Sequence, residues 1–250
     1  MSDEESLQFD YHLAFDDGAL VAIKVRLDGK TLARLDPMPG DAPEWTKLDA
    51  VGCPVCPLTP KTHPRCPVAL CTAELVSRFS ERYSYDLVRL QVVTAERTYV
   101  AATTLQAALG SLTGIYMVTA GCPVMDKLRP MVRFHLPLAT EHETVFRAAA
   151  MYLVAQFMRS QDGDTPDWTL DGLDRIYRDV HQVNRTIAKR VRAAAAKDAT
   201  ANALVRLDLF THGVSRSTHD RLADLRYLFV PTYVRERPDD DLDPVFDPKI

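Results

Sequence analysis

Leu7-Gln-Phe-Asp-Tyr-His-Leu-Ala-Phe15 is the stretch from which the fold is read. Every second side chain in it is apolar, which is the period of a strand with one buried face. A turn sequence, Asp16-Asp17-Gly18, leads to a second alternating run over residues 21–27. A further turn at residues 28–30 precedes residues 31–35, which we expect to form a third strand. The N-terminal part therefore predicts a small antiparallel meander.

A second hairpin and a series of helices follow the meander. Residues 86–100 alternate again around a turn at residues 95–96, whereas later segments repeat their apolar residues at the helical period. Helices are predicted over residues 67–80, 103–118, 140–157, 169–197 and 199–212. Thr140 and Glu143 form a capping-box sequence. Gly213 is expected to end the helix before it, and Ser217 to cap a last one. The predicted class is α+β, with a mostly α-helical remainder after the second hairpin.

The chain of 250 residues is long enough for one large domain. We predict a single α+β domain over residues 1–234 that carries a Cys-rich loop at residues 53–71. Residues 235–250 are rich in Asp and Pro, and we expect an extended or disordered tail there.

Charge and hydropathy narrow the functional classes. The net charge of −4 gives no indication of nucleic-acid binding, which needs a concentrated basic face. The predicted helix 169–197 has a basic end, but cations are favourable at any helix C-terminus. That basic end consists of Arg185, Lys189, Arg190, Arg192 and Lys197. No apolar run reaches the roughly 18 residues of a membrane span. The acidic residues 1–6 do not resemble a secretory signal, so we expect a cytoplasmic protein.

Cysteine spacing provides the clearest functional signal. In a reducing compartment, five cysteines indicate metal or redox chemistry rather than disulfides. Cys53-Pro-Val-Cys56 places two sulfurs on a tight turn, which is a common half-site for tetrahedral metals. His63 and Cys66 follow within the same loop. These four residues predict a structural zinc site.

Cys122, far along the chain, offers an alternative fourth ligand. It precedes proline, as do Cys53, Cys56 and Cys66, and Cys-Pro also occurs at iron–sulfur ligands. A site of these four cysteines would hold zinc or an iron–sulfur cluster, and spacing alone does not separate the two. Cys71 is a further candidate ligand. The alternative without metal is that the thiols are buried small apolar groups or a redox pair.

The segment from Cys122 to His135 holds the candidate catalytic residues. Cys122 would act as nucleophile or ligand, and His135 as base or ligand, with Asp126 nearby in sequence. The structural alternative is that Asp126 forms an internal ion pair with Arg129 or Arg133, and we favour it.

Four phrases in this sequence resemble a family of uncharacterised bacterial proteins. They are Cys53-Pro-Val-Cys-Pro-Leu58, Cys66-Pro-Val-Ala69, Gly121-Cys-Pro-Val-Met-Asp-Lys-Leu128 and Pro130-Met-Val-Arg-Phe-His-Leu-Pro137. The resemblance extends from the N-terminal strands to about residue 210. It implies no activity, and it implies that Cys71 is the least probable ligand.

The sequence thus predicts a metal-binding protein with a Cys-rich site, in an interaction or scaffold module with an unknown protein partner or self-association. The alternative is a redox protein or enzyme whose iron–sulfur or other cofactor is held by Cys53, Cys56, Cys66 and Cys122.

Overall fold

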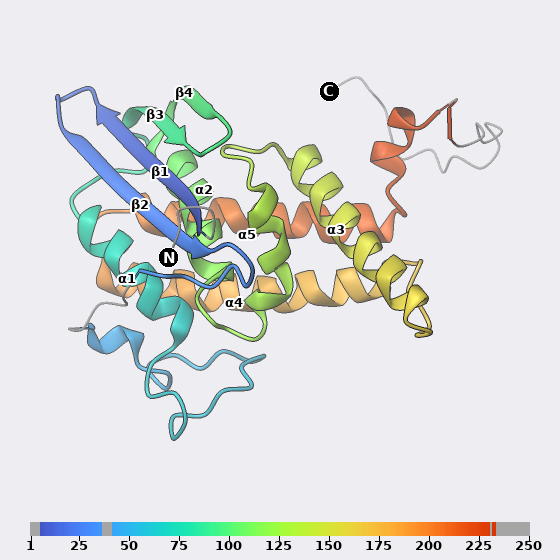
Figure 1. Ribbon diagram of the computed structural model, residues 1–250. Coiled ribbons are helices and arrows are strands. Elements are labelled where there is room, and N and C mark those ends of the chain that lie inside the picture. Colours follow the sequence, from blue (N-terminus) through green and yellow to red (C-terminus); the bar gives the residue numbers. More distant parts are fainter. Residues whose placement is uncertain (1–5, 37–41, 231, 234–250) are drawn as a thin grey trace.

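One antiparallel sheet contains both predicted hairpins. The computed structural model describes residues 6–36, 42–230 and 232–233. Its strands are β1 (Ser6–Phe15), β2 (Leu20–Asp28), β3 (Leu87–Val93) and β4 (Thr98–Thr104). They lie in the order β2-β1-β3-β4 because β1 pairs with both β2 and β3 (Figure 1).

The alternation that predicted β1 also determines which face of the sheet is buried. Its apolar positions are all buried, while the positions between them are partly or fully exposed. β2 and β3 continue this buried face. The hydroxyl of Tyr11 lies 3.0 Å from that of Ser111, so the face packs against the helix that carries Ser111. The apolar period of β1 therefore positions the first helical layer.

Helices make up the rest of the described chain. They are α1 (Pro67–Arg78), α2 (Leu105–Val118), α3 (Glu141–Gln161), α4 (Asp171–Ala194) and α5 (Ala199–His219). Short 3₁₀ segments are η2 (Glu44–Thr46), η3 (Met125–Phe134) and η4 (Ala223–Leu228). The long helices α4 and α5 pack along each other, and α2 and α3 contact α5 (Figure 1). The α+β class is confirmed, as is the capping box of Thr140 and Glu143.

The predicted third strand does not form. Residues 31–35 make a single bridge, from Arg34 to Leu27. The Asp28 carboxylate accepts the backbone N–H groups of Lys30 and Thr31 at 3.1 and 2.7 Å, and Leu32 has a φ of 56°. These bonds and the left-handed residue turn the chain out of the extended conformation, so the strand predicted over residues 31–35 is wrong.

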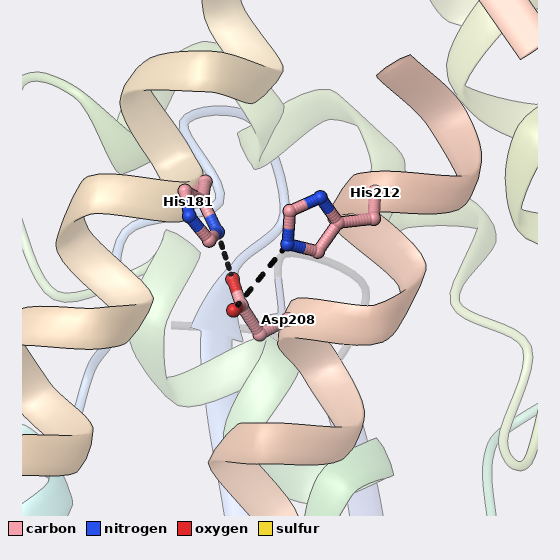
Figure 2. Close-up of side chains that lie close together, drawn as sticks. All are labelled: His181, Asp208 and His212. Carbon is pink, nitrogen blue, oxygen red and sulfur yellow. Dashed lines mark hydrogen bonds and ion pairs between the residues drawn. The ribbon is translucent and has the colours of Figure 1, made fainter. Parts of the chain in front are cut away.

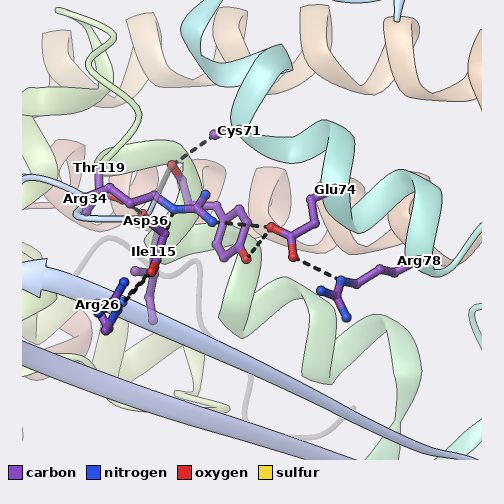
Figure 3. Close-up of polar contacts among 9 residues, drawn as sticks. Arg26, Arg34, Asp36, Cys71, Glu74, Arg78, Ile115 and Thr119 are labelled. Atoms are coloured by element: carbon purple, nitrogen blue, oxygen red, sulfur yellow. Dashed lines mark hydrogen bonds and ion pairs between the residues drawn. The ribbon is translucent and has the colours of Figure 1, made fainter. Parts of the chain in front are cut away.

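Arg34 instead ties this segment to the helices (Figure 3). Its guanidinium lies 3.4 Å from the Glu74 carboxylate of α1 and 4.0 Å from the ring centroid of Tyr116 in α2. The Tyr116 hydroxyl donates to Glu74 at 3.2 Å. The side chain of Arg34 is only 6% exposed, and this network partners its charge.

The helix predicted to end at Gly213 continues to His219, through both Gly213 and Ser217. A Cβ atom at Gly213 would lie 2.6 Å from the Glu141 side chain at the start of α3. This glycine therefore permits a close approach of two helices and does not end one.

One continuous cluster of buried side chains joins the sheet to the helices. The prediction of one domain over residues 1–234 stays a prediction, and the predicted tail at 235–250 lies outside the described residues. Within the described ranges, no helix has both the length and the apolar character needed to cross a membrane.

Candidate functional site

Four of the five cysteines line the same small cavity. Cys53 and Cys56 reach it from the Pro-rich loop, Cys66 from the start of α1, and Cys122 from the segment after α2. The cavity volume is about 20 Å³. The remaining lining is almost wholly apolar and comprises Leu58, Pro67, Val68, Val124, Val183, Thr186 and Ile187. The fold thus brings together sulfurs from distant parts of the sequence.

Backbone hydrogen bonds hold the cysteine loop in place. The N–H of Cys56 donates to the Cys53 carbonyl at 3.1 Å, which closes the predicted tight turn. The N–H of Cys66 donates to the Thr46 carbonyl at 2.8 Å. The first bond lies within the loop, and the second ties the end of the loop at Cys66 to the end of η2.

Arg190 of α4 is the main anchor of the segment before the loop. Its guanidinium donates to the carbonyl oxygens of Trp45, Lys47, Leu48 and Val51, with distances of 3.1, 2.6 and 2.9 Å for the first three. The residue is 2% exposed. The sequence analysis counted Arg190 in the basic end of the predicted helix, and the structure buries this side chain under the segment before the loop.

Burial and hydrogen bonding have opposite effects on the pKa of the Cys66 and Cys122 thiols. Burial raises the pKa of both thiols, which favours the neutral form. Two backbone N–H groups that follow each cysteine oppose the increase, and the Arg190 charge also opposes it at Cys66. Cys66 is the N-cap of α1, so its thiol lies at the positive end of the helix dipole. A bound metal cation would lower the pKa of both thiols and favour the thiolate form.

Two other candidate ligands lie away from the cavity. His63 is exposed, and its Nδ1 lies 3.0 Å from the Thr62 hydroxyl. Cys71 is fully buried, and its thiol donates to the carbonyls of Val68 and Tyr116, each at 3.2 Å. The cavity therefore brings Cys122, and not His63, to the other three cysteines.

The sulfurs are more widely spaced than the ligands of one tetrahedral zinc ion. A Zn–S bond of about 2.3 Å sets neighbouring sulfurs about 3.8 Å apart. Among the described residues, no three cysteine sulfurs lie within 4.8 Å of one another. A zinc ion would draw them closer.

The predicted catalytic residues do not form one site. Asp126 forms an ion pair with Arg129, as the structural alternative predicted. The Nε2 atom of His135 lies 2.7 Å from the Tyr11 hydroxyl and 3.3 Å from that of Ser111. In the described chain, no hydrogen bond joins Cys122 to His135. A thiol–imidazole pair is therefore absent from this arrangement.

His135 lines a second and larger cavity. Desolvation by its surroundings, followed by the Arg147 charge, lowers the pKa of His135 to about 3. The imidazole is neutral at pH 7 and is a hydrogen-bonding group rather than an acid. The cavity has a volume of about 150 Å³ and lies among α2, η3, α3, α4 and α5.

A further cluster between α4 and α5 was missed by the sequence analysis (Figure 2). His181 Nδ1 lies 2.7 Å from Asp208 Oδ1, and His212 Nε2 lies 3.9 Å from Asp208 Oδ2. Two imidazoles and a carboxylate are ligands that divalent transition metals accept. The His181–Asp208 hydrogen bond also satisfies both groups without a metal. The spacing of Asp208 and His212 was visible in the sequence, but the contribution from α4 was not.

Comparison with known proteins gives a family but no activity. No curated protein and no solved structure matches the chain. Residues 9–230 match the family described as a domain of unknown function (DUF6901). This match includes the cysteine cavity, helices α1 to α5 and the sheet apart from the first residues of β1. The chain therefore belongs to the DUF6901 family.

Proposed function

We propose that this chain is a metal-binding protein in which Cys53, Cys56, Cys66 and Cys122 hold one zinc ion in a structural role. The observation that carries the proposal is the convergence of these four side chains on one small, apolar cavity. Thiolates are the ligands that zinc prefers in structural sites. The N–H groups around Cys66 and Cys122 would stabilise those thiolates and orient them.

A structural role agrees with the surroundings of the cysteines. Tetrahedral zinc with four protein ligands has no position left for a substrate. The cavity, at about 20 Å³, suits an ion rather than an ion and a reactant. The metal would cross-link the cysteine loop, the start of α1 and the segment after α2. We place the protein in the cytoplasm, where thiols stay reduced, as an interaction or scaffold module with a protein partner or a second copy.

An iron–sulfur cluster is the second candidate, and one observation favours it. The sulfurs are spaced more widely than zinc needs, and a cluster of several atoms requires wider spacing than a single ion. The chain would then be a redox protein or a cofactor-dependent enzyme.

Metal content and the visible spectrum distinguish these candidates. The protein is purified without oxygen, and zinc, iron and acid-labile sulfide are measured per chain. One zinc in a colourless protein is the expected result. Iron and acid-labile sulfide in a brown protein would favour the iron–sulfur cluster over zinc as the occupant of this site. A folded protein without metal, which also fails to take up zinc or a reconstituted cluster, would overturn the proposal.

Substitutions then identify the ligands. Cys122→Ser should lose most of the metal, whereas His63→Ala should keep it because His63 lies outside the cavity. Cys71→Ala is the matched control, since Cys71 is a cysteine of the same region that does not line the cavity. Loss of metal in His63→Ala with retention in Cys122→Ser would restore the site that the sequence first predicted.

A further inference from the structure

The cavity of about 150 Å³ beside His135 has the size and lining of a small-molecule site. Its walls are mainly apolar side chains of α2, η3 and α5, among them Met117, Leu128 and Leu207. An apolar cavity of this volume accommodates a benzene ring. The cysteine cavity shares none of these lining residues, so the two are separate.

The charges that line this cavity are of one sign. Arg147 and Arg206 contribute to the wall, and no Asp or Glu of the described chain does. Arg206 is exposed and lies over the Phe210 ring, 5.5 Å from its centroid. Arg147 is half-buried, and burial lowers the pKa of its guanidinium. An acidic ligand would offset the cost of this buried positive charge.

Arg147 has hydrogen-bonding capacity that the protein does not use. Its Nη2 donates to the Met131 carbonyl at 3.0 Å, but its Nε is buried without a partner. Glu143, one turn earlier on α3, attracts the guanidinium electrostatically. The Glu143 carboxylate is already engaged at the helix cap, where it accepts the Thr140 N–H at 2.7 Å. The arginine therefore lacks a close anionic partner within the described chain.

Asn184 adds a neutral donor to the same cavity. It is 3% exposed and lines the wall, and no described group of the protein bonds its side-chain amide. Its side-chain amide is not among the fully buried groups without a partner, so a ligand oxygen in the cavity would be able to accept a hydrogen bond from it. His135 contributes no competing charge, because its imidazole is neutral at pH 7.

We propose that this cavity binds a small organic monocarboxylate whose apolar body has about six carbon atoms. Arg147 pairs with the carboxylate, Asn184 offers a further hydrogen bond, and the apolar walls enclose the body of the ligand. Arg206 attracts the anion from the rim.

Isothermal titration with benzoate, and with benzamide as its neutral isostere, tests the proposal on the unmodified protein. Benzoate should bind at least about tenfold more tightly than benzamide, since a charged hydrogen bond is lost with the amide. Hexanoate should show the same preference over hexanamide. Equal affinity of acid and amide, or no binding of any of these probes, would overturn the proposal.

Variants then locate the site. Arg147→Gln keeps a donor for Met131 but removes the charge, and it should weaken benzoate binding about tenfold or more. Arg206→Gln should weaken it less. Arg192→Gln is the matched control, because Arg192 is an exposed arginine of α4 outside the cavity. Circular dichroism checks folding, and Arg147→Met, which also removes the charge, replaces Arg147→Gln if the latter does not fold. Unchanged benzoate affinity in a folded Arg147 variant would place the ligand elsewhere and refute the assignment.

Discussion

Replacing Arg190 with methionine tests whether one side chain holds the segment before the cysteine loop. Four backbone carbonyls would lose a charged donor. Hydrogen bonds to charged groups contribute about 1.5–3 kcal/mol each, or about 6–12 kcal/mol for the set. Methionine would recover apolar packing and relieve the desolvation of a buried charge, which is worth several kcal/mol. We therefore expect a net loss of about 3–5 kcal/mol in the free energy of unfolding.

Thermal unfolding and urea titration measure this loss. For a chain of this size, about 2–4 °C corresponds to each kcal/mol, so Tm should fall by about 6–20 °C. Arg190→Lys should recover only part, because a compact ammonium has three donors for four acceptors. Arg192→Met, an exposed neighbour on the same helix, should change the stability by less than about 0.5 kcal/mol. If Arg190→Met were as stable as Arg192→Met, the anchoring role would be refuted.

Three further perturbations follow from the geometry. Burial lowers the pKa of His135 to about 3. Below about pH 6.5 this imidazole is therefore protonated in the unfolded chain but still neutral in the folded chain, so the free energy of unfolding should fall on acidification by up to about 1.4 kcal/mol per pH unit. Urea titrations between pH 5 and 7 should show a shallower slope for His135→Gln, and an unchanged slope would contradict the assignment. A Cβ atom at Gly172 would lie 1.9 Å from the Tyr152 hydroxyl, so Gly172→Ala should cost about 1–3 kcal/mol. Gly110→Ala, whose nearest contact is 3.6 Å, should be neutral or gain up to about 1 kcal/mol, and equal Tm values for the two variants would count against this reasoning. Thr140→Ala removes the cap of α3 and should lower the free energy of unfolding, measured by urea titration, by about 1 kcal/mol. An unchanged urea midpoint would contradict this role of the cap.

The sheet was predictable where alternation and turn chemistry agreed. The period of β1 and the glycine at residue 18 specify a hairpin that the structure contains. Residues 31–35 were predicted as a strand, but the Asp28 carboxylate accepts the Thr31 N–H and Arg34 turns inward to Glu74. Local hydrogen bonds and a tertiary ion pair determine the conformation of that segment, and neither produces a periodic pattern of apolar residues in the sequence.

The cysteine cavity was only partly predictable. The short spacing of Cys53 and Cys56 indicated a turn that holds two sulfurs, because such geometry is local. The choice between His63 and Cys122 depends on the path of the chain after α2, which brings Cys122 back to the loop. The spacing of cysteines in the sequence does not predict this path. Arg190 resembled any surface arginine in a basic helix end, since its partners are backbone carbonyls that have no sequence signature.

The central place of β1 has a consequence for biosynthesis. β1 leaves the ribosome well before its second neighbour, β3, which begins only at Leu87. Until then the hairpin of β1 and β2 presents a row of unpaired N–H and C=O groups along β1. Such an edge is a template for pairing with another nascent chain. We therefore expect the risk of aggregation on the polysome to be greatest between the synthesis of Asp28 and that of Val93.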